Sequence, residues 1–563
     1  MRIKPAFLVK TGLLVVVINA TNHGALSRVH FLLVDKRLIT LVIFGAIWIL
    51  SLAAILAAAF HPSPGVRLFW AVPLSIAGTA AFAYYAVQQS EFFIFDVLNF
   101  WSARHDVNRA LDFYSGAIAP SLTVLCASFV AFAMPTGLST EVRRPMRFAL
   151  SMAPVLPIGI VILVVLYRDG KGSDAMPKQF APLSLSALAA YKIDTGRFPD
   201  RHQVQFEPGA PLVRALVLMV DESVRADHVS LEPGNPYTPE WASASGPWID
   251  FGPAVSGSNC SNNSNALLRF MASPRNLTTS ITTNPTVWQY AKAAGFRTVY
   301  IDAQAGFISA YGKLQNYMTP SETNSIDRLY KLDTSVPTYQ LDDELIRITL
   351  SELGRGDRVF IYANKNGAHF PYVNDAPGNQ KPPVSIDGNY VGNDPATLAT
   401  YARAVRWSTD RTMAQLTREA NWDGMTMIYT SDHGQNFRPG HLTHCSSASN
   451  VDAQEGIVPL LVATGDQRLR QRFADVSRRF PGRASHFAIA PTLLELMGYT
   501  PSDIAATYDE SLLRDLDTKP RFVSDDLFGV FSSQASWHDV DPFVQRPRME
   551  TAGQHSVQAQ VNY

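Results

Sequence analysis

The stretch RALVLMVDESVRADH, residues 214–228, decides the fold class of this chain. It opens with a continuous apolar and β-branched run and passes directly into charged residues. Such a run is typical of a strand buried on both faces, as in a parallel sheet covered by helices. Ligands of these sheets gather beyond the carboxyl ends of the strands, so the place of Glu222 predicts a functional side chain.

Similar runs recur through the rest of the chain and alternate with helical spacing of apolar residues. The expected strands are 214–220, 296–301, 358–362, 425–429 and 458–462. The expected helices are 286–294, 396–418 and 484–496. This alternation predicts a soluble α/β domain with a mostly parallel sheet between helices.

The N-terminal third of the chain is strongly apolar. Four of its runs have about the 20 residues that a membrane-spanning helix needs: 38–60, 68–89, 115–136 and 148–167. A fifth run, 7–21, is weaker because it contains Lys10 and Asn19, so an interfacial helix or a signal-like segment is the alternative there.

The placement of positive charge favours five crossings. With Arg2 and Lys4 inside, five crossings leave the arginines of the 143–147 loop on the cytoplasmic side, as the positive-inside rule requires. The expected organisation is a transmembrane α-helical domain over 1–167, a linker over 168–205 and a catalytic domain over 206–563. The catalytic domain would then lie outside the cytoplasm.

The charge balance limits the classes of partner. The 48 basic and 48 acidic side chains give a net charge of zero, whereas a nucleic-acid-binding protein needs a basic excess. Membrane and small-molecule partners stay open. The aromatic loop 90–114 favours a helix lying at the membrane interface, with a re-entrant connector as the alternative.

Three residues have the chemistry of a metal site. Glu222 follows the first expected strand, and Asp432 and His433 follow the strand 425–429. A single carboxylate in such a place is often only a helix cap, but an acid and an imidazole side by side at a second strand end favour a ligand set. Two carboxylates and one imidazole suit zinc, or manganese, better than a thiolate-selected ion.

A hydroxyl of the Ser- and Asn-rich segment 256–265 is the candidate nucleophile. Ser264 precedes a helical string, where free backbone amides and the positive end of the helix dipole would stabilise an incoming phosphate. A metal can lower the pKa of such a hydroxyl and activate it. The alternative is a loop that ends in a helix cap.

With these motifs the chain resembles the membrane-anchored phosphoethanolamine transferases of the alkaline phosphatase and sulfatase superfamily, over nearly its full length. The family motif Glu-Ser-x-Arg-Ala-Asp-His with Ser-Leu is similar to residues 222–231. The later motifs are similar to residues 288–304, 368–371 and 401–410. The first of these strings is highly specific.

The resemblance implies a role for each candidate residue. Glu222, Asp432 and His433 would hold zinc together with the nucleophile, which falls on Ser264 because it lies four residues after Cys260. The family's phosphate-binding histidines resemble His369 and His444. His441 competes with His444, because the spacing of His444 from the Asp432-His433 pair is one residue short.

The sequence departs from the family pattern in three places. Gln435 replaces a glutamate, and Phe270 replaces a cysteine. Trp101, His105 and Arg109 stand where the lipid A enzymes have Asn, Thr and Glu. A guanidinium repels an ammonium head group, so phosphoglycerol is an alternative to phosphoethanolamine as the transferred group.

The resemblance implies a bacterial inner-membrane enzyme, monomeric, with its catalytic domain in the periplasm. It would move phosphoethanolamine from a phospholipid donor to an envelope lipid or glycan acceptor, through a covalent phospho-Ser264 intermediate and with zinc as cofactor. A non-catalytic lipid sensor or scaffold is the alternative from another class. A sulfate ester hydrolase is disfavoured because no Cys/Ser-x-Pro-x-Arg string is present.

The three cysteines predict one disulfide. Cys126 lies in an apolar run and is expected to be a small buried packing residue. Cys260 and Cys445 lie in the domain expected in a compartment that permits disulfides. Their loops must converge on one metal, which predicts a Cys260–Cys445 bridge in place of the family's local pairing. Two unpaired thiols are the alternative.

Overall fold

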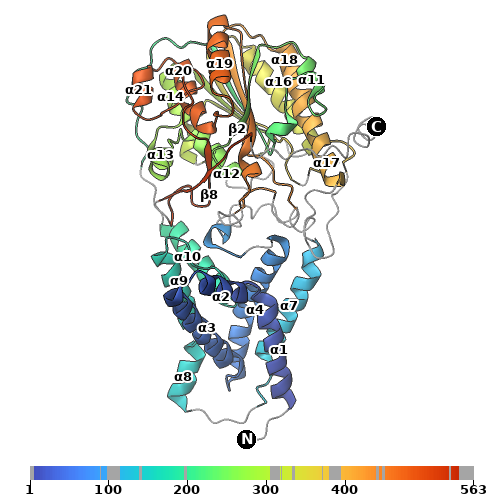
Figure 1. Ribbon diagram of the computed structural model, residues 1–563, viewed down its shortest axis with the longest axis vertical. Helices are drawn as coiled ribbons and strands as arrows, with labels where there is room; N and C mark the ends of the chain where they lie inside the picture. Colours follow the sequence, from blue (N-terminus) through green and yellow to red (C-terminus); the bar gives the residue numbers. More distant parts are fainter. Residues whose placement is uncertain are drawn as a thin grey trace. The chain divides into compact units, whose positions relative to one another are not determined.

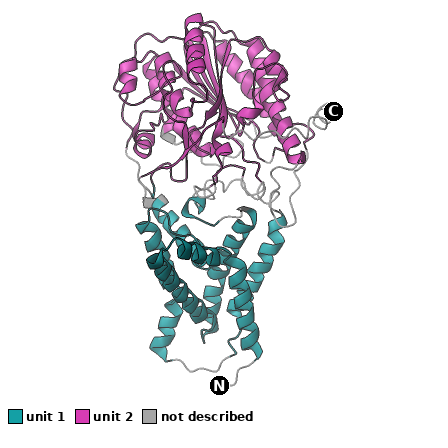
Figure 2. Ribbon diagram, in the orientation of Figure 1, with its two compact units in different colours: residues 1–197, 384–390, 530–533 teal, residues 198–383, 391–529, 534–563 magenta. Residues whose placement is uncertain are grey.

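The computed structural model describes 5–88, 91–97, 115–137, 143–195, 200–304, 318, 320–332, 336–370, 372–379, 395–438, 443–446, 451–531 and 534–543. The chain divides into two compact units (Figure 2). Unit 1 is formed mainly by Met1–Arg197, and unit 2 contains most of the chain from Phe198 onward. Trp101, His105, Arg109 and His441 lie outside the described residues.

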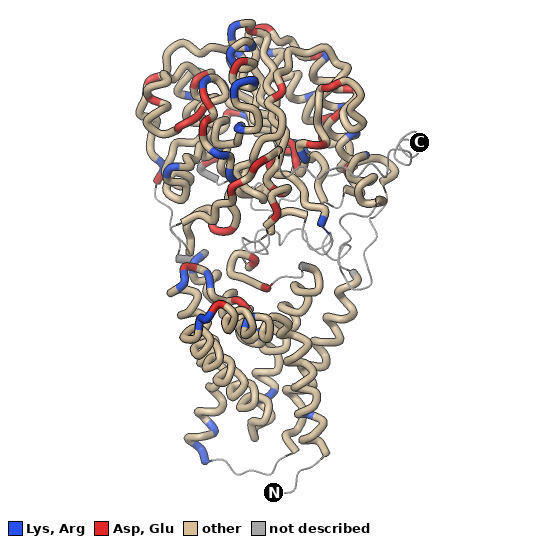
Figure 3. Tube along the Cα trace, in the orientation of Figure 1, with Lys and Arg blue, Asp and Glu red and all other residues tan. Residues whose placement is uncertain are grey.

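Unit 1 consists of helices that are nearly free of charge (Figure 3). Four of its helical segments are long and apolar enough to cross a membrane: Leu38–Ala59 (α3), Pro64–Val87 of α4 (Pro64–Gln88), Gly116–Ala133 of α7 (Ser115–Ala133), and Arg144–Tyr167, which joins α8 (Arg144–Met152) to α9 (Val155–Tyr167). They coincide with the four runs predicted from the sequence. Cys126 is exposed on α7 and not buried as expected, because this helix packs against its neighbours along one side only.

The fifth expected span forms a bent pair of helices. Helix α1 (Pro5–Thr21) meets α2 (Gly24–Val34) at 62°, and the pair is apolar enough to count as a fifth span. Lys10 is fully buried, and its ammonium donates to the carbonyls of Phe132 at 2.9 Å and Met134 at 2.6 Å. These carbonyls belong to the last turn of α7, where cations are favourable. An apolar helix can therefore carry this charge.

The expected linker contains a helix of unit 1. Helix α10 (Ala181–Thr195) buries Leu185, Leu188 and Ala189, which recur at the spacing of one helix face. Pro182 lies in the first turn of the helix, where a proline is tolerated. The chain leaves unit 1 after this helix.

Unit 2 is built on a seven-stranded sheet of order β2-β7-β6-β1-β5-β3-β4 (Figure 1). Its strands are β1 (Ala215–Asp221), β2 (Trp248–Val255), β3 (Arg297–Asp302), β4 (Arg328–Lys331), β5 (Val359–Asn364), β6 (Met425–Ser431) and β7 (Ile457–Thr464). Strands β6, β1, β5, β3 and β4 run parallel. All five expected strands are present.

Strand β7 departs from the expected parallel arrangement. It runs antiparallel to β6, and β2 runs antiparallel to β7. The connection from β6 ends in the short turn Ala453–Gly456, which leads directly into β7, and its described residues contain no crossover helix. A strand that enters the sheet at the end where the preceding strand left it must run antiparallel to that strand.

Helices cover both faces of the sheet. Along β1, Leu216, Leu218 and Val220 pack on one face with residues of α14 (Val287–Ala293), α19 (Gln467–Arg479) and α20 (Ile489–Leu496). The alternate residues of β1 pack on the other face with α16 (Leu341–Leu353), α17 (Pro395–Val405) and α18 (Arg411–Glu419). Strand burial on both faces explains why β1 has no polar residue before its end.

Candidate active site

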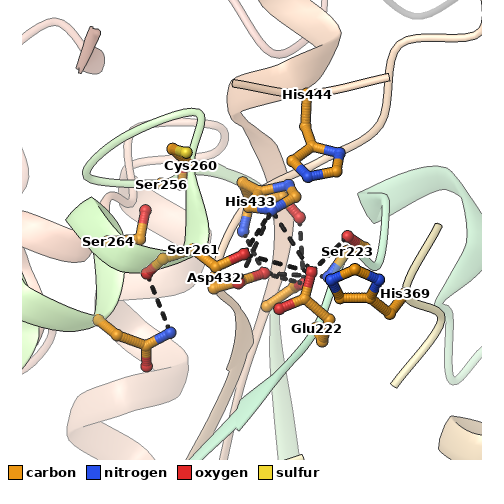
Figure 4. A network of polar contacts seen from close by, with 12 residues as sticks. Glu222, Ser223, Ser256, Cys260, Ser261, Ser264, His369, Asp432, His433 and His444 are labelled. Atoms are coloured by element: carbon orange, nitrogen blue, oxygen red, sulfur yellow. Dashed lines mark hydrogen bonds and ion pairs between the residues drawn. The ribbon is translucent and has the colours of Figure 1, made fainter. Parts of the chain in front are cut away.

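The candidate metal ligands meet at the carboxyl ends of two neighbouring strands. Glu222 follows β1, and Asp432 and His433 follow β6, which is hydrogen-bonded to β1. One ligand atom from each of the three residues lies within 4.8 Å of the other two, and all three side chains are fully buried (Figure 4). Two segments that lie far apart in the sequence therefore contribute to one cluster.

The distances within the cluster fit a small cation. His433 Nε2 lies 3.5 Å from Glu222 Oε1 and 3.7 Å from Asp432 Oδ2. Zinc binds oxygen and nitrogen ligands at about 2.0–2.2 Å, which puts two ligands of a tetrahedral ion roughly 3.3–3.6 Å apart. The two measured separations are therefore close to those of ligands around one zinc-sized ion.

The hydrogen bonds of His433 and Asp432 leave one atom of each residue directed at the cluster. His433 Nδ1 lies 2.8 Å from the carbonyl of Gly434, which fixes the hydrogen on Nδ1 and leaves the lone pair of Nε2 free. Asp432 Oδ1 accepts from the amides of Ser223 at 3.0 Å and His433 at 2.7 Å. Asp432 Oδ2 is buried without a hydrogen-bond partner among the described residues. A buried carboxylate oxygen of this kind calls for a cation or a proton.

The electrostatics of the cluster agree with that conclusion. Burial, then the nearby Asp432 carboxylate, raise the pKa of Glu222 well above its usual value. Burial raises the pKa of Asp432 to about 6 and lowers the pKa of His433. Two buried carboxyls that repel each other are stabilised as carboxylates by a divalent cation. The donor set therefore fits a metal.

Zinc affinity should rise with pH as a consequence. Protons compete with the metal for carboxylates whose pKa values are raised, so the zinc dissociation constant should fall roughly tenfold per pH unit for each proton displaced, up to about pH 7. Competition with a chelator at several pH values measures this slope. Asp432→Asn should bind zinc weakly and with a smaller slope, and an affinity independent of pH would contradict the assignment.

The metal-free protein should show the opposite trend in stability. The pKa of Asp432 is raised from 3.8 to about 6 in the folded state, so its contribution to stability is present below its ordinary pKa. That contribution is lost as the pH rises through about 6. Thermal unfolding of chelator-treated protein should therefore show a falling transition temperature over this range, and added zinc should reverse the fall.

Ser261, and not Ser264, contacts the cluster. Helix α12 (Ser261–Arg269) begins at Ser261, whose Oγ lies 3.0 Å from His433 Nε2 and 3.3 Å from Glu222 Oε1. The Oγ of Ser264 instead donates to the carbonyl of Ser258 at 2.8 Å and accepts from the amide of Ser258 at 3.0 Å (Figure 4). Ser261 Oγ is thus the hydroxyl of this segment that lies within hydrogen-bond distance of two candidate ligands.

Two further residues that the sequence did not single out support Glu222. Ser223 has a φ of +62°, which turns the chain sharply after β1 and lets its hydroxyl donate to Glu222 Oε1 at 2.6 Å. Gln304, just beyond β3, donates from Nε2 to Glu222 Oε2 at 2.8 Å. A serine in the left-handed region is strained, and such strain is typical of functional turns. Both Glu222 oxygens are therefore held in place.

Two histidines flank the cluster. The ring of His444 stacks on that of His433, with centroids 4.5 Å apart and planes at 17°, and His369 lies 6.3 Å from His444 (Figure 4). Burial, then the neighbouring His433 and His369, lower the pKa of His444 well below its usual value. At neutral pH this imidazole is uncharged and has one N–H that can donate to an oxygen.

A disulfide joins Cys260 to Cys445, with α-carbons 4.6 Å apart. The predicted bridge is therefore present. It links the residue before Ser261 to the residue after His444. The bridge brings the segment around Cys260 to the cluster, but it does not by itself distinguish Ser261 from Asn259 on the other side of Cys260.

Comparisons with known proteins agree with the fold. A family model described as Sulfatase matches residues 214–499, more than half of the chain. A comparison with curated protein sequences found no match. The membrane protein lipooligosaccharide phosphoethanolamine transferase A from Neisseria meningitidis is similar in structure, with 16% identity and a TM-score of 0.55 over 79% of this chain and 85% of that one. The periplasmic domain of EcEptC from Escherichia coli matches at 19% identity and a TM-score of 0.47, over 61% of this chain and 97% of that domain.

Proposed function

This chain belongs to the sulfatase family, and we propose that within it the chain is a membrane-bound, metal-dependent phosphotransferase. It would transfer phosphoethanolamine from a phospholipid to an envelope lipid or glycan. One observation carries the proposal: two carboxylates and an imidazole form a buried cluster, and a serine hydroxyl at the start of α12 lies within hydrogen-bond distance of two of them. The apolar helices of unit 1 support a lipid donor.

We assign the nucleophile to Ser261. Its Oγ forms a bond to the phosphorus of the donor phosphodiester and loses its proton to solvent, while the bond from phosphorus to the diacylglycerol oxygen breaks and that oxygen gains a proton. An acceptor hydroxyl then attacks the phosphoserine, and Ser261 regains its hydroxyl. The two half-reactions predict ping-pong kinetics.

Zinc is the proposed cofactor. Glu222, Asp432 and His433 would hold it together with Ser261, and the unpartnered Asp432 Oδ2 supports this fit. When bound, the ion would lower the pKa of the serine hydroxyl and offset negative charge developing at phosphorus. The amides at the start of α12 would add to that stabilisation, because helix N-termini favour phosphate groups.

The neighbouring histidines would orient the transferred phosphate. His444 is uncharged at neutral pH and stacks on His433, so its N–H can donate to a phosphate oxygen without repelling a metal beside it. His369 would serve the same purpose from the other side of His444. Both roles are part of the proposal.

The location of unit 2 follows from the same proposal. The Cys260–Cys445 disulfide supports an oxidising compartment, which for a bacterial membrane protein is the periplasm. We therefore propose an inner-membrane enzyme with unit 2 in the periplasm. This agrees with the arginines at the start of α8 lying on the cytoplasmic side.

The test is transfer by the purified full chain in vesicles. Zinc-loaded protein should release diacylglycerol from phosphatidylethanolamine and gain the mass of phosphoethanolamine on the peptide that contains Ser261. Chelation should stop both events, zinc should restore them, and manganese serves as the comparison metal.

Three outcomes separate the alternatives. Release from phosphatidylglycerol alone, with phosphoglycerol on the same peptide, would make the chain a phosphoglycerol transferase. Release from neither lipid by zinc-loaded protein would contradict the proposed activity and favour a sensor or scaffold. Labelling on the Ser264 hydroxyl would overturn the assignment of the nucleophile.

A further inference from the structure

We propose that the Cys260–Cys445 disulfide is a positioning element that fixes the nucleophile Ser261 relative to His444, so that its reduction switches off transfer while zinc and the fold of unit 2 are retained. This inference rests on the proposed function for its effect on transfer. Its effect on the geometry of His444 does not depend on any activity.

The covalent and non-covalent contacts form a closed ring. Cys260 is bonded to Ser261 along the chain, and Ser261 Oγ lies 3.0 Å from His433 Nε2. The ring of His433 stacks on His444, and His444 is followed directly by Cys445, whose sulfur returns to Cys260 (Figure 4). When the disulfide is reduced, Cys260 and Cys445 are joined covalently only through the chain, with 184 residues between them.

Hydrogen bonds also join the segment around Cys260 to the segment around Cys445. The carbonyl of Asn259 accepts a hydrogen bond from the amide of Cys445 at 2.8 Å. The side-chain amide of Asn259 donates to the carbonyl of Ser446 and to Glu455 Oε2, each at 2.8 Å. The amide of Ser446 also donates to Glu455 Oε2, at 3.1 Å. Because these groups are buried, the segments stay together after reduction. Loss of the disulfide should therefore act locally.

The backbone at Cys445 explains why His444 would nevertheless move. Cys445 has a φ of +56°, a left-handed conformation that is unfavourable for a residue with a Cβ. The cross-link holds the residue there. Once free, Cys445 can return to a negative φ, which changes the direction of the chain at His444 and separates its ring from His433.

The bond is placed for exchange with a thiol. Both cysteines are half-buried, whereas the metal ligands are fully buried. A dithiol attacks one sulfur, forms a mixed disulfide and then closes its own disulfide, leaving two thiols on this chain. Two electrons and two protons pass from the dithiol to the Cys260–Cys445 pair. No further reactant is required.

The test uses zinc-loaded full chain in detergent and the double variant Cys260→Ser/Cys445→Ser. We expect the double variant to lose at least tenfold in kcat with zinc content unchanged and a cooperative thermal transition retained. Reduction of the wild type should give the same loss, and reoxidation should restore activity. Cys126→Ser is the matched control, because its thiol is free: it should keep full activity and the same sensitivity to reduction.

The geometry is tested without an activity assay. The rate of carbethoxylation of His444, measured by peptide mass spectrometry, should change at least threefold on reduction. The rate at His538, which is also half-buried but remote in sequence from the cluster, should not change. A change at His444 without any transfer by the oxidised protein would contradict the proposed function and leave the positioning intact.

Three results would overturn the inference. The first is a double variant with wild-type kcat. The second is an unchanged rate at His444 after reduction. The third is loss of zinc and of the cooperative transition in the double variant, which would make the disulfide a general structural cross-link. Asn259→Ala adds a comparison, since it weakens the polar connection and should lower the transition temperature while keeping most of the kcat.

Discussion

Replacing Ser261 by alanine should lower the rate of transfer by about a thousandfold or more. The substitution removes the atom that attacks phosphorus, and loss of a nucleophile costs nearly the whole chemical acceleration. The fold should be unaffected, because alanine at the first position of a helix fits the space of serine. Among the residues that the structure describes, the Ser261 hydroxyl forms hydrogen bonds to Glu222 and His433, both side chains of the cluster. Diacylglycerol release in vesicles measures the effect.

Ser264→Ala is the matched control for this prediction. It removes the two hydrogen bonds to Ser258, each worth about 1 kcal/mol, and should lower the transition temperature while keeping transfer within a few-fold of the wild type. The reverse pattern, with Ser264→Ala inactive and Ser261→Ala active, would restore the assignment made from the sequence. Zinc content of both variants distinguishes loss of the nucleophile from loss of the metal.

The two serines show what a sequence can and cannot specify. Ser261 and Ser264 are three residues apart in a helix, so they lie on nearly the same face but about 4.5 Å apart along the axis. The sequence predicts a hydroxyl on that face at the start of a helix, but not the residue at which the helix begins. The helix begins at Ser261, and the contacts with Glu222 and His433 follow from that.

The meeting of the candidate metal ligands was predictable because the strands before them are apolar on both faces. An uninterrupted apolar run ends at the carboxyl end of its strand, so Glu222 and Asp432 could be located together at the carboxyl ends of the parallel strands. Strand β2 gave no such signal, because Asp250, Gly252 and Pro253 interrupt it. It lies at an end of the sheet, where a proline and a shift of register are tolerated.

Lys365 is a residue that no sequence pattern identified, because a lysine is ordinarily solvated. It follows β5 and is fully buried beneath the cluster, with Nζ 2.7 Å from Asp221 Oδ2 and 2.7 Å from the carbonyl of Ser408. Asp221 Oδ2 also accepts from the hydroxyls of Tyr429 at 2.9 Å and Thr409 at 2.8 Å. Asp221 directly precedes Glu222, so this buried ion pair fixes the position of the residue next to a candidate metal ligand.

Lys365→Met should destabilise unit 2 by about 3–5 kcal/mol, the range for removing one partner of a buried ion pair. Methionine has a similar length but leaves the charge of Asp221 uncompensated in dry surroundings, where burial raises the pKa of the adjacent Asp342 to about 6.

Lys292→Met is the matched control: Lys292 pairs with Asp327 at 2.8 Å, but both side chains are exposed, and such pairs contribute at most about 1 kcal/mol. Thermal unfolding of the two variants in detergent measures the difference. Adding Asp221→Asn to Lys365→Met should recover part of the loss, because the uncompensated charge is then gone; equal transition temperatures for Lys365→Met and Lys292→Met would show that the buried pair contributes no more than a surface one.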